Sequence, residues 1–137
     1  MPPRRFLVAE RSMAPTLEPG DRILTLNRTP DVGDVVVSND PDGLRIVKRV
    51  VAAGPATVTI AAGEVVVDGV ALAEPWCVDE TPGAGTWRLA VGELFLLSDA
   101  RHRTLADSRT WGPRHESDLV GVVVARYRPL AKIGRIR

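Results

Sequence analysis

Hydrophobic residues occur in short runs along the chain, each bounded by Gly, Pro, Asp or Asn. The runs are about four to seven residues long and rich in Val, Ile and Leu, which is typical of β-strands. They cover residues 22–26, 34–37, 45–51, 57–60, 64–67, 93–97 and 119–125. This pattern predicts an all-β domain.

Turn signals separate the predicted strands, and no segment shows a sustained helical period with a capped start. The turns fall at Pro19-Gly20-Asp21, Gly33-Asp34, Pro41-Asp42-Gly43, Ala62-Gly63 and Asp68-Gly69. Helix is therefore expected only in short turns. Residues 78–85 include two acids, one Pro and two Gly, so they are predicted to form an exposed loop. We place this loop at the tip of a β lobe, residues 54–89, inserted into a single domain spanning residues 1–137.

Composition and charge exclude several classes of protein. The 137 residues are 45% hydrophobic and 26% charged, with a formal net charge of +1, as in an ordinary globular domain. Basic residues are scattered instead of forming one block, so binding to nucleic acid is not expected. Cys77 has no second cysteine for a disulfide and no ligand at zinc spacing, so we expect no metal and no cofactor.

No apolar run is long enough for a membrane-spanning helix. The longest candidates, such as residues 119–125, are far shorter than the roughly 20 residues that such a helix needs. The apolar stretch 6–9, which follows Arg4 and Arg5, is too short for the core of a secretory signal peptide. The sequence therefore predicts no anchor and no export signal.

Lys48 is a candidate general base. Only two of the 18 basic residues are lysines, Lys48 and Lys132, so arginine serves almost everywhere that a positive charge is needed. A lysine differs from arginine because its amine can lose a proton, and burial among apolar groups lowers its pKa. Lys48 lies between Ile46-Val47 and Val50-Val51 in a predicted strand. The alternative is an ordinary solvated lysine on a strand.

Ser12 is a candidate nucleophile. It precedes Pro15, which restricts the backbone, and the Pro-Gly-Asp turn. A serine needs an adjacent base to become nucleophilic, and lysine can replace histidine in that role. His102 and His115 lie in polar, loop-like surroundings and do not support a histidine triad. The alternative for Ser12 is an ordinary turn serine.

These two residues belong to an ordered set of short motifs. In order, the set is Ser12-Met13-Ala14-Pro15-Thr16-Leu17, Gly20-Asp21, Gly33-Asp34-Val35-Val36, Lys48-Arg49-Val50, Val67-Asp68-Gly69, Glu74-Pro75-Trp76, Ser98-Asp99, Asp107-Ser108-Arg109 and Trp111-Gly112. The set resembles that of type I signal peptidases from about Val8 to the C-terminus. Self-cleaving repressor domains share the first motif, whereas the Asp-Gly to Glu-Pro-Trp hairpin and the Asp-Ser-Arg-x-Trp-Gly box are similar to signal peptidases in particular.

The resemblance implies coiled antiparallel sheets with a small inserted β lobe. It implies Ser12 as nucleophile, Lys48 as general base and the Ser12 backbone N–H as a donor to the oxyanion. Four further residues would support them: Thr104 by a hydrogen bond to the amine, Asp107 and Arg109 by bracing the loop that carries Thr104, and Met13 by packing near the cleft.

Three features depart from the family pattern. Glu10 stands where many members have a small or hydroxyl residue, and an ionised carboxylate can only accept hydrogen bonds. The family's Gly-Asp-Asn is Ser98-Asp99-Ala100 here, and the loop from there to Asp107 is one residue longer. The membrane anchor that normally precedes the serine is absent from this sequence.

The resemblance implies a serine endopeptidase that cleaves signal peptides, or a similar N-terminal extension, through an acyl-enzyme. Its partner would be an extended peptide or preprotein with small residues one and three positions before the cleaved bond. It would work at the extracytoplasmic face of the cell membrane. One alternative is a soluble, cytoplasmic maturation protease for one dedicated partner. Another is a catalytically inactive β-domain that binds peptides by strand addition.

A third alternative, a self-cleaving repressor, is not favoured, because only eleven residues precede Ser12. The sequence also predicts a contact with the membrane surface. Five apolar residues lie around Ser12, namely Phe6, Leu7, Val8, Met13 and Leu17, with Arg4, Arg5 and Arg11 available for anionic headgroups. The alternative is that these apolar residues form the first strand and its core contacts.

Overall fold

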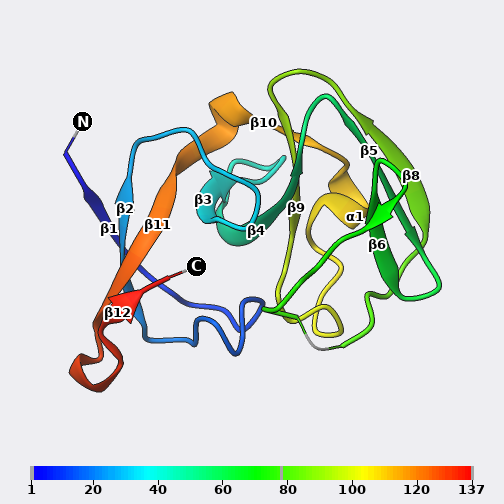
Figure 1. The fold of residues 1–137 in the computed structure, drawn as a ribbon. Helices are drawn as coiled ribbons and strands as arrows, with labels where there is room; N and C mark the ends of the chain where they lie inside the picture. Colours follow the sequence, from blue (N-terminus) through cyan, green and yellow to red (C-terminus); the bar gives the residue numbers. More distant parts are fainter. Residues whose placement is uncertain (1, 78, 137) are drawn as a thin grey trace.

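Two antiparallel β-sheets contain almost all of the regular structure (Figure 1). The computed structural model describes residues 2–77 and 79–136. The larger sheet has the strand order β1-β2-β11-β3-β4-β9-β10, with β12 paired to β11. Its strands are β1 (Arg4–Leu7), β2 (Arg22–Leu26), β3 (Val35–Asn39), β4 (Arg45–Ala53), β9 (Glu93–Leu97), β10 (Arg114–His115), β11 (Leu119–Arg128) and β12 (Gly134–Arg135).

The smaller sheet has the order β7-β6-β5-β8 and is built from one continuous stretch of chain. Its strands are β5 (Ala56–Ala61), β6 (Glu64–Val67), β7 (Val70–Ala71) and β8 (Gly85–Leu89). Helical structure in the described residues is limited to α1 (Ser108–Trp111) and the short 3₁₀ turns η1 (Glu116–Asp118) and η2 (Leu130–Lys132). The predicted all-β class is confirmed.

Every predicted hydrophobic run coincides with a strand or lies mostly within one, but β1, β7, β8, β10 and β12 were not predicted. β1 begins with two arginines, and β7, β10 and β12 have only two residues each, so none of them forms an apolar run. Of the predicted loop 78–85, Val78 lies outside the described residues. Residues 79–84 contain no strand or helix, and Gly85 already begins β8.

β4 connects the two sheets. Its first half pairs with β3 and its second half pairs with β9, with Lys48 opposite Val36 and Arg49 opposite Leu97. The chain then passes through Gly54 into β5. A side chain at Gly54 would place Cβ 1.8 Å from the Ala90 carbonyl oxygen, so only glycine allows this close approach. Because β9 pairs with β4 only from Arg49 onward, the other edge of Arg45–Lys48, away from β3, has no strand partner among the described residues.

Buried apolar side chains fill both sides of β4. One cluster includes side chains from β2, β3 and β11. Another lies between β9 and the smaller sheet, where the centroids of the Trp87 and Phe95 rings are 4.8 Å apart. Val8, Met13 and Leu17 belong to the first cluster. The prediction that these three residues form a membrane-facing edge is therefore wrong, because they are core residues. Phe6 is half-buried, and Leu7 alone of the five is 60% exposed.

Candidate active site

Lys48 is buried in the middle of β4. The residue is only 4% exposed, and its Nζ donates a hydrogen bond to Ser98 Oγ at 3.0 Å. Burial lowers the pKa of the amine, because the charged form loses its hydration, and Arg109 lowers it further. The carboxylates of Asp107, Glu10 and Asp99 oppose this shift without cancelling it. The neutral form of the amine, which can accept a proton, is therefore populated at lower pH than in a solvated lysine.

Ser12 lies in a series of turns between β1 and β2. Its carbonyl accepts a hydrogen bond from the Ala100 N–H at 2.9 Å, and the Asp99 N–H points to Met13 Sδ at 3.4 Å. These two contacts fasten the Ser12 segment to residues 98–100. Met13 itself packs in the core beside the pocket. The side chains of Ser12 and Lys48 are thereby brought to one site from positions far apart in the sequence.

Ser12 and Lys48 line the same small pocket, of about 160 Å³. Its other lining residues come from the segment before Ser12, from Met13 and from the unpaired half of β4: Leu7, Val8, Ala9, Glu10, Met13, Arg45, Ile46 and Val47. Most of the wall is apolar, with exposed Glu10 and Arg45 as its additional charged groups. In this structure the amine is hydrogen-bonded to Ser98 and not to Ser12.

Thr104 does not contact the amine, contrary to the prediction from the resemblance. Its Oγ1 accepts a hydrogen bond from the Ala106 N–H at 2.9 Å, and its carbonyl accepts one from Arg109 Nη2 at 2.8 Å. The hydroxyl is thus engaged by the loop itself. The hydroxyl beside Lys48 belongs to Ser98, which we did not predict as a site residue. One signal in the sequence pointed to it, namely a serine where the family has glycine.

Asp107 and Arg109 form a buried ion pair, with Nη2 and Oδ2 2.7 Å apart. The Asp107 carboxylate also accepts a hydrogen bond from the Ser98 N–H at 3.0 Å. Arg109 reaches the carbonyl oxygens of Pro82 and Arg101 as well as that of Thr104. Burial by itself would raise the pKa of the Asp107 carboxyl, but the hydrogen bonds from Arg109 and Ser98 outweigh it and lower that pKa.

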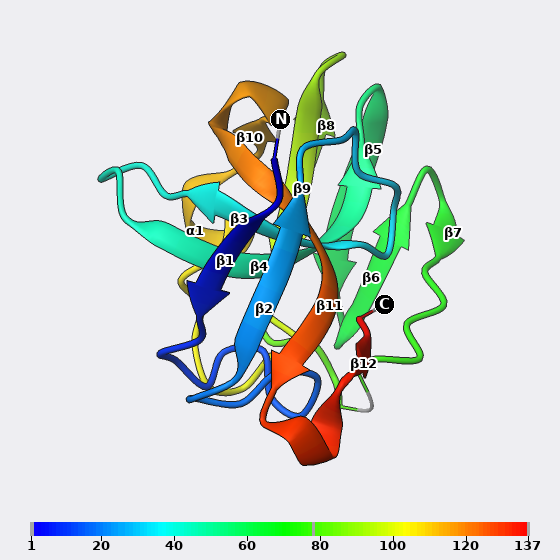
Figure 2. The same cartoon turned by 90° about the vertical axis from the view of Figure 1, so that its left-hand side faces the viewer.

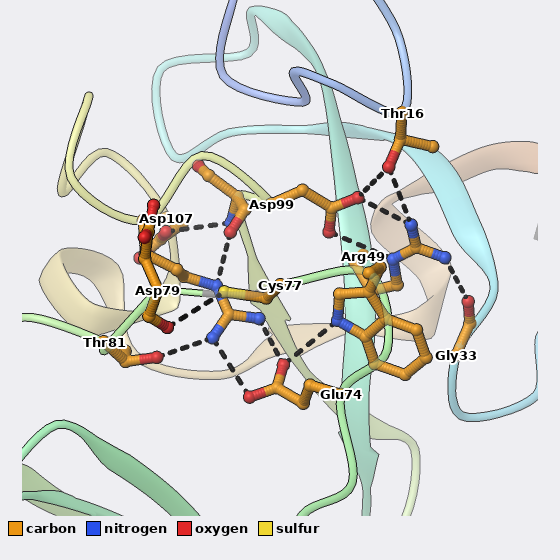
Figure 3. Close-up of polar contacts among 12 residues, drawn as sticks. Thr16, Gly33, Arg49, Glu74, Cys77, Asp79, Thr81, Asp99 and Asp107 are labelled. Carbon is orange, nitrogen blue, oxygen red and sulfur yellow. Dashed lines mark hydrogen bonds and ion pairs between the residues drawn. The ribbon is translucent and has the colours of Figure 1, made fainter.

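A second buried ion pair lies beside the site (Figure 3). Arg49 follows Lys48, Asp99 follows Ser98, and Arg49 binds both carboxylate oxygens of Asp99, at 3.0 and 2.6 Å. Thr16 donates to the same carboxylate at 2.6 Å, and the Trp76 ring lies 4.5 Å from the guanidinium. This bidentate pair fixes the two segments that carry Lys48 and Ser98 against each other.

Arg101 extends this network toward the smaller sheet. Its guanidinium pairs with Glu74 and donates to Thr81 Oγ1 at 2.8 Å, and its Nε donates to the Ser98 carbonyl (Figure 3). Trp76 Nε1 donates to Glu74 at 3.1 Å. Through Arg101, Glu74 and Thr81 therefore support the backbone around Ser98. Among the described residues, no group of three or more His, Cys, Asp or Glu side chains is placed to hold a metal ion.

Comparisons with known proteins identify the family of this chain. A family model described as signal peptidase, peptidase S26, matches residues 3–128. The probable signal peptidase I-1 of Synechocystis sp. is 30% identical, with 96% of this chain and 78% of the relative covered. A probable thylakoidal processing peptidase 2, chloroplastic, of Arabidopsis thaliana is 28% identical over 94% of this chain and 39% of its own length.

A solved structure shares the fold. The crystal structure of a signal peptidase I from Enterococcus faecalis superimposes with a TM-score of 0.62. The match covers 69% of this chain and 97% of that chain, at 23% sequence identity. At this level of identity the similarity concerns the fold alone. The shared fold, together with the family model, agrees with the antiparallel sheets described above.

Proposed function

Because this chain belongs to the signal peptidase family S26 and is therefore a peptidase, we propose that it cleaves signal peptides or similar N-terminal extensions with a Ser12–Lys48 dyad. The observation that carries the proposal is a buried amine of lowered pKa in the same pocket as a serine hydroxyl. Family members named signal peptidase I and thylakoidal processing peptidase support an extended peptide or preprotein as substrate.

The proposed reaction has two steps. The neutral Lys48 amine takes the proton of the Ser12 hydroxyl as Oγ attacks the scissile carbonyl, and the resulting ammonium returns a proton to the leaving amine. This breaks the peptide bond and leaves an ester on Ser12. In the second step, Lys48 takes a proton from a water molecule as its oxygen attacks the ester carbonyl. The bond between this carbon and Ser12 Oγ then breaks, the Lys48 ammonium returns the proton to Ser12 Oγ, and the acyl product leaves as a carboxylic acid. In this proposal, the Ser12 N–H stabilises the oxyanion of each step.

The unpaired edge of β4 supports binding of an extended substrate. A peptide beside Arg45–Lys48 can form main-chain hydrogen bonds with this edge, as in strand addition. Its alternate side chains then point toward the pocket of about 160 Å³, which favours small residues. This arrangement is consistent with small residues one and three positions before the cleaved bond.

Two substitutions test the dyad. Ser12→Ala removes the nucleophile, and Lys48→Arg keeps a positive charge but cannot act as the base. Each is expected to lower kcat/KM by more than about 10³-fold for a peptide with alanine one and three positions before the scissile bond. Circular dichroism verifies that each variant is folded. Near-normal activity of Lys48→Arg would overturn the dyad.

Glu10 favours a second candidate function, a β-domain that binds extended peptides without cleaving them. Its carboxylate lies in the pocket where a hydrogen-bond donor would assist the oxyanion. The same peptide distinguishes the two functions. Binding without cleavage, equal in wild type and Ser12→Ala, supports the binding domain, whereas cleavage that Ser12→Ala abolishes supports the peptidase mechanism.

A further inference from the structure

We propose that Ser98, and not Thr104, is the residue that positions the Lys48 amine for proton transfer. This inference rests on the proposed function of the Ser12–Lys48 pair. It assigns the positioning role to a residue where the family pattern has glycine, and it removes that role from the residue that the family pattern indicates.

The first argument is the contact itself. Lys48 Nζ and Ser98 Oγ are 3.0 Å apart, and Ser98 is fully buried. A neutral amine has two N–H donors and one lone pair. When one N–H is held by Ser98 Oγ, rotation about the terminal C–N bond is restricted, and the lone pair can be directed to the pocket that Ser12 lines.

The second argument is that Ser98 is held rigidly. Its N–H donates to Asp107 Oδ2 at 3.0 Å, and its carbonyl accepts a hydrogen bond from Arg101. On its two sides, Leu97 is paired with Arg49 in the sheet, and Asp99 forms the buried ion pair with Arg49. A side chain on a backbone fixed at so many points can orient the amine, because its own position varies little.

The third argument is the position of Thr104. Its hydroxyl is occupied by the Ala106 N–H within an exposed part of the loop, and its carbonyl is held by Arg109. Neither of these Thr104 hydrogen bonds involves Lys48. Ser98 needs no rearrangement, since it already makes the contact.

The Ser98 hydroxyl also affects the charge state of the amine. A hydrogen bond from an ammonium is stronger than one from a neutral amine, so the acceptor at Ser98 stabilises the charged form. Its loss in Ser98→Ala should therefore lower the pKa of Lys48 further. The same variant should reduce kcat by about 10²-fold because the amine is misplaced, with KM little changed, since Ser98 does not line the substrate pocket.

The titration of Lys48 can be observed directly, because the chain has only two lysines, Lys48 and the exposed Lys132. NMR of ¹⁵N- and ¹³C-labelled lysine side chains gives one signal from each. In Ser98→Ala, the Lys48 signal is expected to titrate at lower pH than in wild type. In the matched control Thr104→Val, both the titration and kcat should remain as in wild type.

The opposite pattern would overturn the inference. If Thr104→Val shifts the Lys48 titration and lowers kcat while Ser98→Ala does neither, Thr104 is the positioning residue. If Ser98→Ala does not fold, the Thr104→Val variant alone still decides, because activity and titration must then be unaffected. A wild-type chain that cleaves no peptide contradicts the proposed function, but the two titrations still test which hydroxyl contacts Lys48.

Discussion

Glu10 brings a negative charge to the pocket that contains Ser12 and Lys48. This carboxylate acts on the active site in two ways. It raises the pKa of Lys48, in opposition to burial, and its charge would repel the oxyanion that the proposed mechanism forms beside Ser12. At the scale of single residues, Glu10 is thus the feature most unfavourable to the proposed mechanism.

Glu10→Gln is therefore expected to increase activity. With the carboxylate removed, the pKa of Lys48 falls, so the rise of kcat/KM with pH moves to lower pH. At a pH on this rising limb, kcat/KM should increase several-fold, since each pKa unit corresponds to about a tenfold change in the neutral fraction. Peptide cleavage measured from pH 5 to 10 tests this. Glu116→Gln, far along the chain on η1, is the control, and an unchanged profile for Glu10→Gln would contradict the argument.

At the scale of elements, the Asp107–Arg109 pair holds the turn between β9 and α1 against the sheet. Asp107 accepts hydrogen bonds from the N–H groups of Ser98 and Arg109 and from the Arg109 side chain. The carboxylate is fully buried, so it must stay ionised and paired for the loop to keep its conformation. The Asp107 carboxylate is thus one of several contacts that hold the segment presenting Ser98 to Lys48.

Asp107→Asn should lower the free energy of unfolding by about 3–5 kcal/mol, because it leaves Arg109 buried without its counter-charge. The pH dependence follows from the lowered pKa of Asp107. Its stabilisation is fully present above the unfolded-state pKa and is lost as pH falls through the lower folded-state pKa. Urea unfolding of wild type and variant from pH 2 to 7 should therefore converge at the acidic end. A constant difference would contradict this explanation.

The strands could be predicted to different extents from the sequence. β3, β4, β9 and β11 are buried in the sheet, so runs of Val, Ile and Leu mark them. β1 is an edge strand with exposed arginines, and a local pattern does not distinguish it from a loop. Its pairing with β2 depends on the rest of the sheet and could not be inferred from its own residues.

The candidate site was predictable where it depended on residue type and not where it depended on loop conformation. Lys48 was indicated by a lysine in an apolar strand of an arginine-rich chain, and Ser12 by its motif. That Ser98 and not Thr104 contacts Lys48 depends on the path of the loop between Asp99 and Asp107. The Arg49–Asp99 pair joins residues 50 positions apart, and single-sequence reasoning has no means of matching them.

For the whole molecule, the surface most suited to a membrane is the outer face of β1 and β2, which lie side by side in Figure 2. Leu7 pairs with Arg22 and Arg5 with Leu24, so leucines and arginines share this face. Within the described residues, no helix has the length and hydrophobicity to cross a bilayer.

We expect weak, salt-sensitive binding of the chain to anionic vesicles. Arg5→Gln and Arg22→Gln should each weaken binding roughly fivefold, since one basic residue near a membrane surface contributes about 1 kcal/mol. Arg88→Gln, in β8 of the smaller sheet, should bind as wild type does. Co-sedimentation at low and high salt measures this. Complete absence of binding at low salt would favour a processing protease that acts on a dissolved partner.

Under the proposed mechanism, the unpaired half of β4 would also limit which proteins are cleaved. Within β4, only Arg45–Lys48 has an unpaired edge, because β9 pairs with the strand from Arg49 onward. A chain that lies along this edge must first be free of its own backbone hydrogen bonds, because each N–H and C=O can serve only a limited number of partners. In a folded domain, most of these groups are already paired within the domain itself. Under the proposed mechanism, mature folded proteins would be spared, and cleavage would be confined to segments that are already unfolded and extended.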